Sequence, residues 1–182
     1  MRGAQKKIII EMSYFTDYSF ADELIHATNR GIHVEIILPR QADVVDNLNK
    51  MIVHYLLKKT RDNLKIYFSP KMIHAKLMMI DDAITFLGSA NLTQYTNGRI
   101  LEANILVNDR ETSFTKKLQR QLEKDKRSAL LVSRGNKISC SSLRALAESL
   151  YIDQDSNFPQ QPRLVSIISG LEQGIRRLYF EG

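Results

Sequence analysis

The sequence of 182 residues has a single cysteine, Cys140, and no long apolar run. One cysteine excludes an intrachain disulfide and is compatible with a reducing compartment. The apolar run nearest the start, Ile8–Ile10, is much shorter than the core of a secretory signal, and no segment approaches the roughly 18 apolar residues of a membrane span. We therefore expect a protein of the cytoplasm or the membrane periphery, without a signal peptide or a transmembrane segment.

The chain carries an excess of positive charge. The chain has 26 Lys and Arg residues against 20 Asp and Glu residues, a net charge of +6. Its 43% hydrophobic and 25% charged residues are ordinary for a folded soluble domain, which excludes collagenous, low-complexity and wholly disordered chains. This excess favours binding to polyanions such as nucleic acid or anionic lipid headgroups. A surface charge that only keeps the protein soluble is an equally open interpretation.

Strand and helix patterns alternate along most of the chain. Apolar, β-branched runs predict strands at Lys7–Met12, Ile32–Leu38, Leu64–Phe68, Met72–Ile80, Ala83–Leu87 and Ile100–Val107. Helical spacing predicts one helix that begins after an N-cap at Asp17 or Ser19 and ends at Gly31, and two more at Asp43–Lys59 and Glu111–Lys126. This order predicts an α/β fold with a mixed β-sheet flanked by helices.

The character of the chain changes after Arg127. A serine-rich linker covers residues 133–142, and helical patterns follow at Ser142–Leu150 and Leu164–Leu178. We therefore expect a domain over residues 1–127, then a linker and helical C-terminal extension over residues 128–182. The extension is expected to pack on the domain or on a second copy of the chain.

The residues best suited to catalysis or binding lie in the segment Ile73–Leu92. His74 and Lys76 are separated by one residue on a predicted strand, so both side chains leave the same face. An imidazole beside an ammonium makes a site for an anion, with a titratable nucleophile next to a fixed positive charge. Asp81 closes this strand, where a carboxylate can cap the turn or hold a neighbouring cation.

A predicted loop follows the second strand of this segment. Gly88 permits close backbone approach, while Ser89 and Asn91 can donate hydrogen bonds to oxygen ligands. A hairpin that returns beside the first strand would bring Asn91 near His74. The segment therefore predicts a site for an oxyanion.

The pattern HxKxxxxD followed by GSxN resembles the HKD motif of the phospholipase D superfamily. The residues at the six motif positions are His74, Lys76, Asp81, Gly88, Ser89 and Asn91. Glu102 resembles the acidic residue that follows the motif. The resemblance covers residues 4–125 and is greatest to the second half of two-motif enzymes such as cardiolipin synthases.

The resemblance implies a phosphodiesterase that works without a metal or another cofactor, by two displacements. The implied catalytic residues are His74, Lys76, Asp81, Asn91 and Glu102, and those that would bind the substrate phosphate are Lys76, Ser89 and Asn91. One histidine attacks phosphorus to form a phosphohistidine, and a second, protonated histidine donates to the leaving alcohol. Glu102 would hold the other ring nitrogen of His74. We expect Asp81 to orient its surroundings rather than to transfer protons.

The family's site needs two motifs, whereas this sequence has one. The three other histidines, His26, His33 and His54, lack an HxK context, and we interpret them as surface or packed residues. A homodimer, or pairing with a second HKD-containing chain, would supply the missing motif. A fragment of a two-motif enzyme, inactive alone, is the third possibility.

Three weaker candidates have simpler explanations. Asp81 and Asp82 are typical of a tight turn rather than of a metal pair. Cys140 has no neighbouring histidine to activate it as a nucleophile. A basic helix face is usually solvated, with contact to phosphate backbones or headgroups as the alternative; its residues are Lys116, Lys117, Arg120, Lys124, Lys126 and Arg127.

Three functions stay open from the sequence. The preferred one is cleavage of phospholipids, or transfer of their phosphatidyl group, because the long helix Asp43–Lys59 and the flanking strands resemble the lipid enzymes. Against it, the D-x-R-S element that usually follows GSANL is absent, and Thr93–Thr96 stands there. The alternatives are a single-motif, homodimeric endonuclease, which the length and charge also fit, and an inactive HKD binding module.

Overall fold

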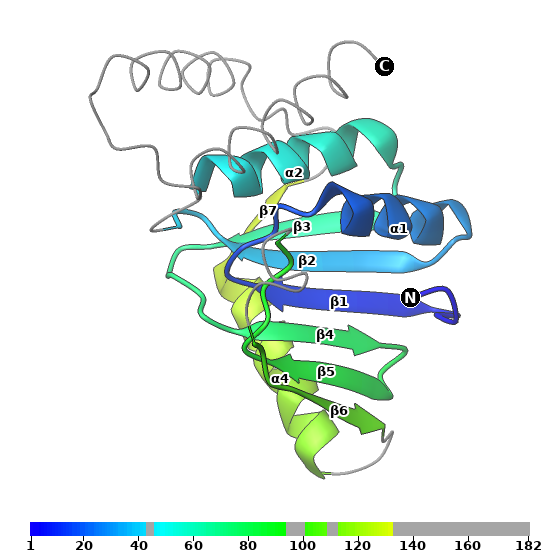
Figure 1. The fold of residues 1–182 in the computed structure, drawn as a ribbon, viewed down its shortest axis with the longest axis vertical. Helices are drawn as coiled ribbons and strands as arrows, with labels where there is room; N and C mark the ends of the chain where they lie inside the picture. Colours follow the sequence, from blue (N-terminus) through cyan, green and yellow to red (C-terminus); the bar gives the residue numbers. More distant parts are fainter. Residues whose placement is uncertain (43–45, 94–100, 109–112, 133–182) are drawn as a thin grey trace. The chain divides into compact units, whose positions relative to one another are not determined.

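The computed structural model describes residues 1–42, 46–93, 101–108 and 113–132. Its strands are β1 (Lys7–Met12), β2 (His33–Pro39), β3 (Leu64–Ser69), β4 (Lys76–Ile80), β5 (Ile84–Gly88), β6 (Asn104–Asn108) and β7 (Leu130–Val132). Its helices are α1 (Tyr18–Asn29), α2 (Asp46–Lys59) and α4 (Ser113–Ser128). Figure 1 labels each of them.

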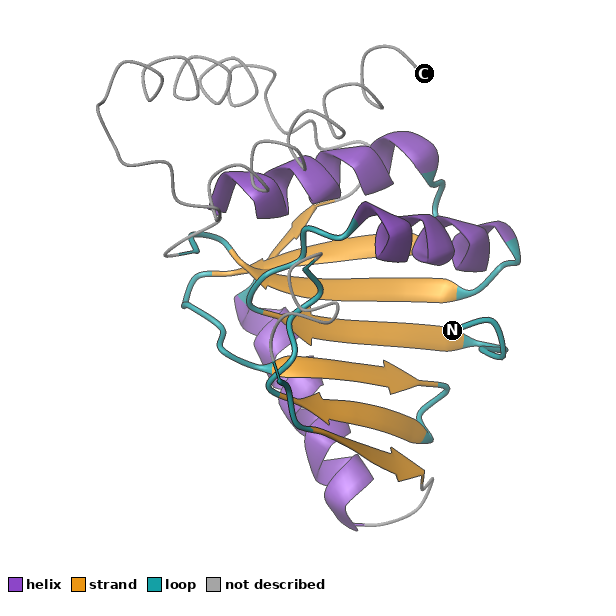
Figure 2. Cartoon of the chain, in the orientation of Figure 1, coloured by secondary structure: helices purple, strands orange, loops and turns teal. Residues whose placement is uncertain are grey.

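The strands form one mixed sheet in the order β6-β5-β4-β1-β2-β3-β7. Strands β1, β2 and β3 are parallel, and the other pairs are antiparallel. Helices α1 and α2 cover one face of the sheet, and α4 crosses the other face, behind the strands as drawn (Figures 1 and 2). The predicted α/β fold with a mixed, helix-flanked sheet is confirmed.

Strand β1 lies at the centre of the sheet and is apolar on both of its faces. Ile8 and Ile10 are fully buried, and Ile9, which alternates with them, is 3% exposed. Ile9 belongs to the cluster on which α4 packs through Leu122. Burial on both faces explains the continuous apolar run in the sequence, because a strand covered by helices on two sides has no solvent-facing positions.

The structure contains the predicted ends of α1 and the predicted tight turn at Asp81-Asp82. The Asp17 side chain accepts hydrogen bonds from the amides of Ser19 and Phe20 and caps α1, while Gly31 follows that helix with φ of +86°. Asp81 and Asp82 have φ of 53° and 55°, and the Ala83 amide donates to the Ile80 carbonyl at 3.0 Å. These two aspartates form the tight β4–β5 turn, as expected from the sequence.

The ends of several strands differ from the prediction. β4 begins at Lys76 rather than Met72, because its partner β1 ends at Met12, which lies opposite Lys76. β6 begins at Asn104 rather than Ile100. A short strand that was not predicted, β7, pairs with β3 and extends the sheet past Arg127. The predicted linker and helices of the C-terminal extension lie outside the described residues. None of the described helices is long and apolar enough to cross a membrane.

Candidate active site

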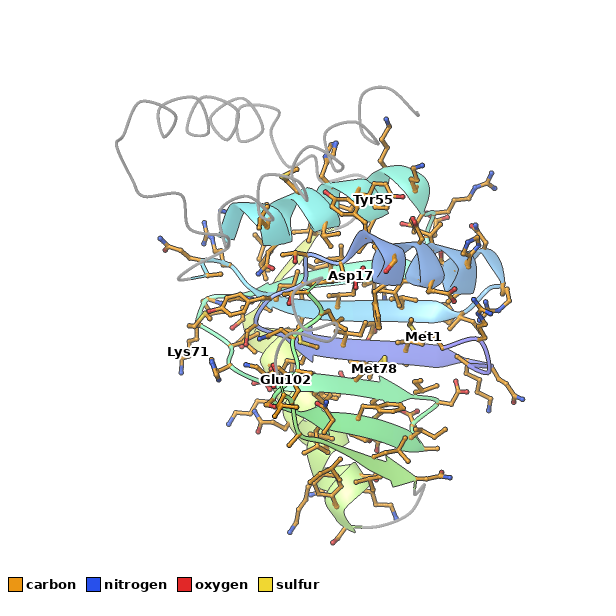
Figure 3. The ribbon with its side chains drawn as sticks, viewed as in Figure 1. Met1, Asp17, Tyr55, Lys71, Met78 and Glu102 are labelled. Carbon is orange, nitrogen blue, oxygen red and sulfur yellow. The ribbon has the colours of Figure 1, made fainter. Side chains whose placement is uncertain are left out.

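The predicted site residues other than Asp81 lie toward the edge of the sheet where β1 ends and β4 begins. Because these two strands are antiparallel, Lys76 at the start of β4 lies opposite Met12 at the end of β1. His74 lies two residues before β4, in an irregular segment, and is exposed. Glu102 lies toward the same edge of the sheet as Lys71, on the left in Figure 3.

His74 and Lys76 contact each other, although only Lys76 is in a strand. The Lys76 Nζ atom lies 3.3 Å from the His74 Nδ1 atom and donates to the His74 carbonyl at 2.9 Å. The ammonium therefore folds back along its own chain and fixes the segment that holds the imidazole. Partial burial lowers the pKa of Lys76, and the Glu102 carboxylate opposes this effect.

Ser13 is a site residue that the sequence analysis missed. It follows β1, is fully buried, and its Oγ atom accepts a hydrogen bond from Lys76 Nζ at 3.1 Å. The same hydroxyl donates to the Ala75 carbonyl at 3.4 Å. Ser13 therefore joins the end of β1 to the Lys76 ammonium and to the backbone of the preceding residue, Ala75.

Asn49 on α2 holds the segment around Ser13 and was also missed. Its amide nitrogen donates to the Ser13 carbonyl at 2.9 Å, and its carbonyl oxygen accepts from the Phe15 amide at 2.8 Å. Asn49 is fully buried. The sequence does contain a signal for this residue: Asn49 has helical spacing to Ile52 and Leu56 and so lies on the buried face of α2. A buried amide needs hydrogen-bond partners.

The Gly88-Ser89 part of the motif docks on the segment before β6. The Ser89 amide donates to the Ala103 carbonyl at 3.0 Å, and the Ala103 amide donates to Ser89 Oγ at 3.0 Å. A Cβ atom on Gly88 would overlap the Ala103 carbonyl and Asn104. Glycine is therefore needed for close approach of the two backbones.

Ser89 positions the Glu102 carboxylate, because its hydroxyl donates to Glu102 Oε2. The resemblance assigned Glu102 to the second ring nitrogen of His74. In the part of the chain that the structure describes, no hydrogen bond joins these two side chains. The Glu102 carboxylate instead accepts the hydrogen bond from Ser89, and its negative charge acts on the Lys76 ammonium.

Asn91 is half-buried and precedes Leu92, which joins the loop after β5 to the end of β1. The Leu92 carbonyl accepts from the amides of Thr16, at 2.8 Å, and Asp17, at 3.2 Å. These bonds keep the Asn91 segment on the edge of the sheet that holds Ser13. The loop after β5 therefore returns to the end of β1.

Asp81 lies at the other end of β4, about 17 Å of strand from Lys76. Its Oδ1 atom accepts from the amides of Lys6, at 2.8 Å, and Lys7, at 2.9 Å, and its Oδ2 atom accepts from the Gln5 amide at 2.8 Å. This carboxylate fixes the chain that enters β1. The arrangement supports the expected orienting function and separates Asp81 from the other motif residues.

The three remaining histidines lie away from this edge. His26 is exposed in the last turn of α1, and His33 is exposed at the start of β2. His54 is half-buried on α2, where burial and Lys58 lower its pKa. Among the described residues, none of them approaches His74, so the site contains one imidazole per chain. The described residues also include no cluster of three or more His, Cys, Asp or Glu side chains that could hold a metal ion.

One ionisable group near the site is unusual for its burial. Glu11, next to Met12 on β1, is 8% exposed, and burial followed by the charge of Asp125 on α4 raises its pKa to about 7. It lies opposite Leu77 in the sheet. This carboxyl is therefore partly protonated at neutral pH and becomes largely protonated as the pH falls below its pKa.

Comparison with known proteins agrees with this geometry. The family model "Cardiolipin synthase, PLD-like domain" matches residues 1–126. Cardiolipin synthase B of Shigella flexneri is 28% identical over 116 residues, which are 62% of this chain and 27% of that protein. The chain thus spans about a quarter of the length of the curated relatives that it matches.

Solved structures show the same fold in chains of similar length. NucT from Helicobacter pylori superposes with a TM-score of 0.59 and 25% identity, over 70% of this chain and 82% of NucT. Nuc from Salmonella typhimurium, a phospholipase D family member, superposes with a TM-score of 0.63 and 15% identity, over 72% of this chain and 84% of Nuc. Because the family model matches residues 1–126 of the chain, and the motif residues other than Asp81 lie at one sheet edge, the chain belongs to the phospholipase D superfamily, in the PLD-like domain family of cardiolipin synthase.

Proposed function

We propose that this chain cleaves phospholipids, or transfers their phosphatidyl group, through a phosphohistidine intermediate on His74. The observation that carries the proposal is the contact of 3.3 Å between Lys76 Nζ and His74 Nδ1 at an open edge of the sheet. A cation and an imidazole side by side can bind a phosphodiester and attack it. The match to the cardiolipin synthase family over residues 1–126 supports a lipid substrate.

The first displacement begins when a phosphodiester oxygen takes the place of Nδ1 as a partner of the Lys76 ammonium. Lysine can only donate, so in the free site it holds Nδ1 as an acceptor and leaves the proton of a neutral ring on Nε2. Release of Nδ1 allows the ring to carry its proton there and exposes the Nε2 lone pair. Nε2 then forms a bond to phosphorus as the bond to the leaving alcohol oxygen breaks.

A second imidazole completes the proton balance. It donates its proton to the leaving alcohol and then accepts one from the water or alcohol that attacks the phosphohistidine, which breaks the P–N bond. In the described part of the chain no second histidine reaches the site. We therefore propose that a second copy of the chain, or another HKD-containing chain, contributes it across an interface that joins the two sites.

The second candidate is endonuclease activity on DNA or RNA. The extent of the matches supports it, since this chain covers 82% of NucT and 84% of Nuc but 27% of cardiolipin synthase B. The single motif and the net charge of +6 also agree with this alternative. The chemistry at His74 would be the same for both substrates.

The decisive experiment offers both substrates to one protein. Purified protein in EDTA is incubated with vesicles of phosphatidylglycerol or cardiolipin and, separately, with single- and double-stranded nucleic acid. The lipid proposal predicts release or exchange of the headgroup, and loss of this activity in His74→Ala, with His33→Ala as the matched control. Cleavage of nucleic acid alone would establish the endonuclease, and turnover of neither substrate would support the binding module.

Mixing wild-type with His74→Ala protein tests whether two chains share one catalytic site. If each catalytic centre needs two His74 residues, wild-type protein re-equilibrated with an excess of His74→Ala protein loses activity per wild-type chain, because most wild-type chains then have an inactive partner. Sizing in solution gives the oligomeric state. A monomer with full activity would contradict the shared site.

A further inference from the structure

Helix α4 has a strongly cationic outer face that the proposed reaction does not use. Five basic side chains on it are exposed: Lys116, Lys117, Arg120, Lys124 and Arg127. At 3.6 residues per turn they fall within an arc of about 100° and extend over about 17 Å of the helix. We call these five residues the α4 cation stripe.

The opposite side of α4 packs on the sheet. Thr115 and Leu122 are fully buried there, and Lys126 is 8% exposed. The sequence analysis placed Lys126 on the solvated basic face, which is wrong. Lys126 instead donates to Glu35 at 2.7 Å and to Glu123 at 2.5 Å. The apolar face of α4 is thus occupied, and only its charged face is available to a partner.

In the part of the chain that the structure describes, Glu123 is the one acidic side chain that lines the same surface as the stripe. The two acidic residues within α4 already have partners, since Glu123 binds Lys126 and Asp125 accepts from Gln121 Nε2 at 2.9 Å. Among the residues that the structure describes, none of the five stripe side chains forms an ion pair. Five adjacent cations exceed the single carboxylate of Glu123 beside them and repel one another, and a surface of several anions relieves this repulsion.

Exposed apolar side chains lie beyond both ends of the stripe. Phe114, in the first turn of α4, is 43% exposed, and Leu131, just after its last turn and opposite Tyr67 on the α4 face of the sheet, is 40% exposed. Apolar groups next to cations gain free energy at a bilayer interface, where the headgroups bind the charges and the acyl boundary accepts the apolar atoms. A nucleic-acid backbone would bind only the cations.

We propose that the α4 cation stripe binds the surface of an anionic phospholipid bilayer and so holds the enzyme at the membrane. This inference rests on the proposed phospholipid activity and adds to it a second contact, on the face of the sheet opposite to α1 and α2. The contact is peripheral and electrostatic, because the buried face of α4 cannot insert. It therefore weakens as salt is added.

Sedimentation of vesicles tests the contact independently of turnover. Full-length His74→Ala protein is mixed with vesicles of phosphatidylcholine alone or of phosphatidylcholine with phosphatidylglycerol. We expect binding only to the anionic vesicles, lower by about fivefold for each charge removed in Arg120→Gln/Lys124→Gln. The matched control, Lys58→Gln/Lys59→Gln, removes two exposed charges from α2, on the other face of the sheet, and should bind as the parent does.

A conservative variant separates charge from structure. Lys116→Arg/Lys124→Arg keeps the charge and should keep the binding. Wild-type binding by the neutralised stripe, or binding to duplex DNA with none to anionic vesicles, would overturn the inference. Hydrolysis of a soluble phosphodiester by the same stripe variants on the wild-type background reports the catalytic site alone. Failure of the proposed function therefore appears as lost turnover with intact vesicle binding, and failure of this inference as the reverse.

Discussion

The Lys76 Nζ atom lies 3.3 Å from Nδ1 of His74 and is held there by the fully buried Ser13. This contact places a positive charge beside the proposed nucleophile before any substrate arrives. Such preorganisation stabilises charge that develops on the phosphate oxygens in the transition state. The first prediction follows from this contact.

Lys76→Gln should lower kcat on a soluble phosphodiester by about 10²–10³-fold, because the charge that stabilises the transition state is lost. The variant should still fold, since Lys76 is only half-buried. Lys71→Gln, which removes an exposed cation from the segment just before His74, serves as the control. Equal losses in the two variants would indicate a diffuse electrostatic effect and not the specific contact.

Asp81→Asn should lower stability and leave kcat unchanged. The carboxylate accepts three backbone hydrogen bonds from Gln5, Lys6 and Lys7, and an amide offers one acceptor oxygen instead of two. The expected cost is on the order of 1–3 kcal/mol in urea unfolding. Asp82→Asn, in the same turn with φ of 55°, should be nearly neutral. A large loss of kcat at unchanged stability would assign Asp81 to the chemistry.

Gly88→Ala should destabilise the fold by about 1–3 kcal/mol, because the new methyl group overlaps the Ala103 carbonyl and forces the segment before β6 to move. Activity should fall as well, since the same segment holds Glu102 against Ser89. Gly3→Ala adds a methyl group where nothing lies within 4 Å. Its unfolding free energy should match that of the wild type, and similar losses in both variants would contradict the close-approach explanation.

Glu11→Gln should stabilise the protein at pH 8 and have little effect at pH 4. The pKa of Glu11 is about 7 in the folded protein, above its ordinary value of 4.5. The folded state therefore binds a proton more tightly than the unfolded state, and stability is lost as the pH rises through this interval. The neutral amide avoids this loss, on the order of 1–3 kcal/mol. Urea unfolding at the two pH values measures it; equal stability of the variant and wild type at pH 8 would contradict the buried-charge explanation.

Local patterns in the sequence determined most of the elements. The β-branched run of β1 predicted a strand, Asp17 predicted the cap of α1, and the pair Asp81-Asp82 predicted the tight turn. Each of these features depends on neighbouring residues only. The six motif residues were also visible from the sequence, because their spacing along the chain is itself the signal.

Tertiary structure decided which side chains meet. Asn49 reaches Ser13 from 36 residues away, Glu102 contacts Ser89 rather than His74, and Lys126 leaves the basic face for Glu35, 91 residues distant in the chain. The register of β4 against β1 set the strand start at Lys76. Such contacts depend on strand pairing and on the packing of helices over the sheet, in which residues remote in sequence become neighbours. A pattern of short period carries no information about them, so the sequence determined the elements and motif while the fold decided the partners of each functional group.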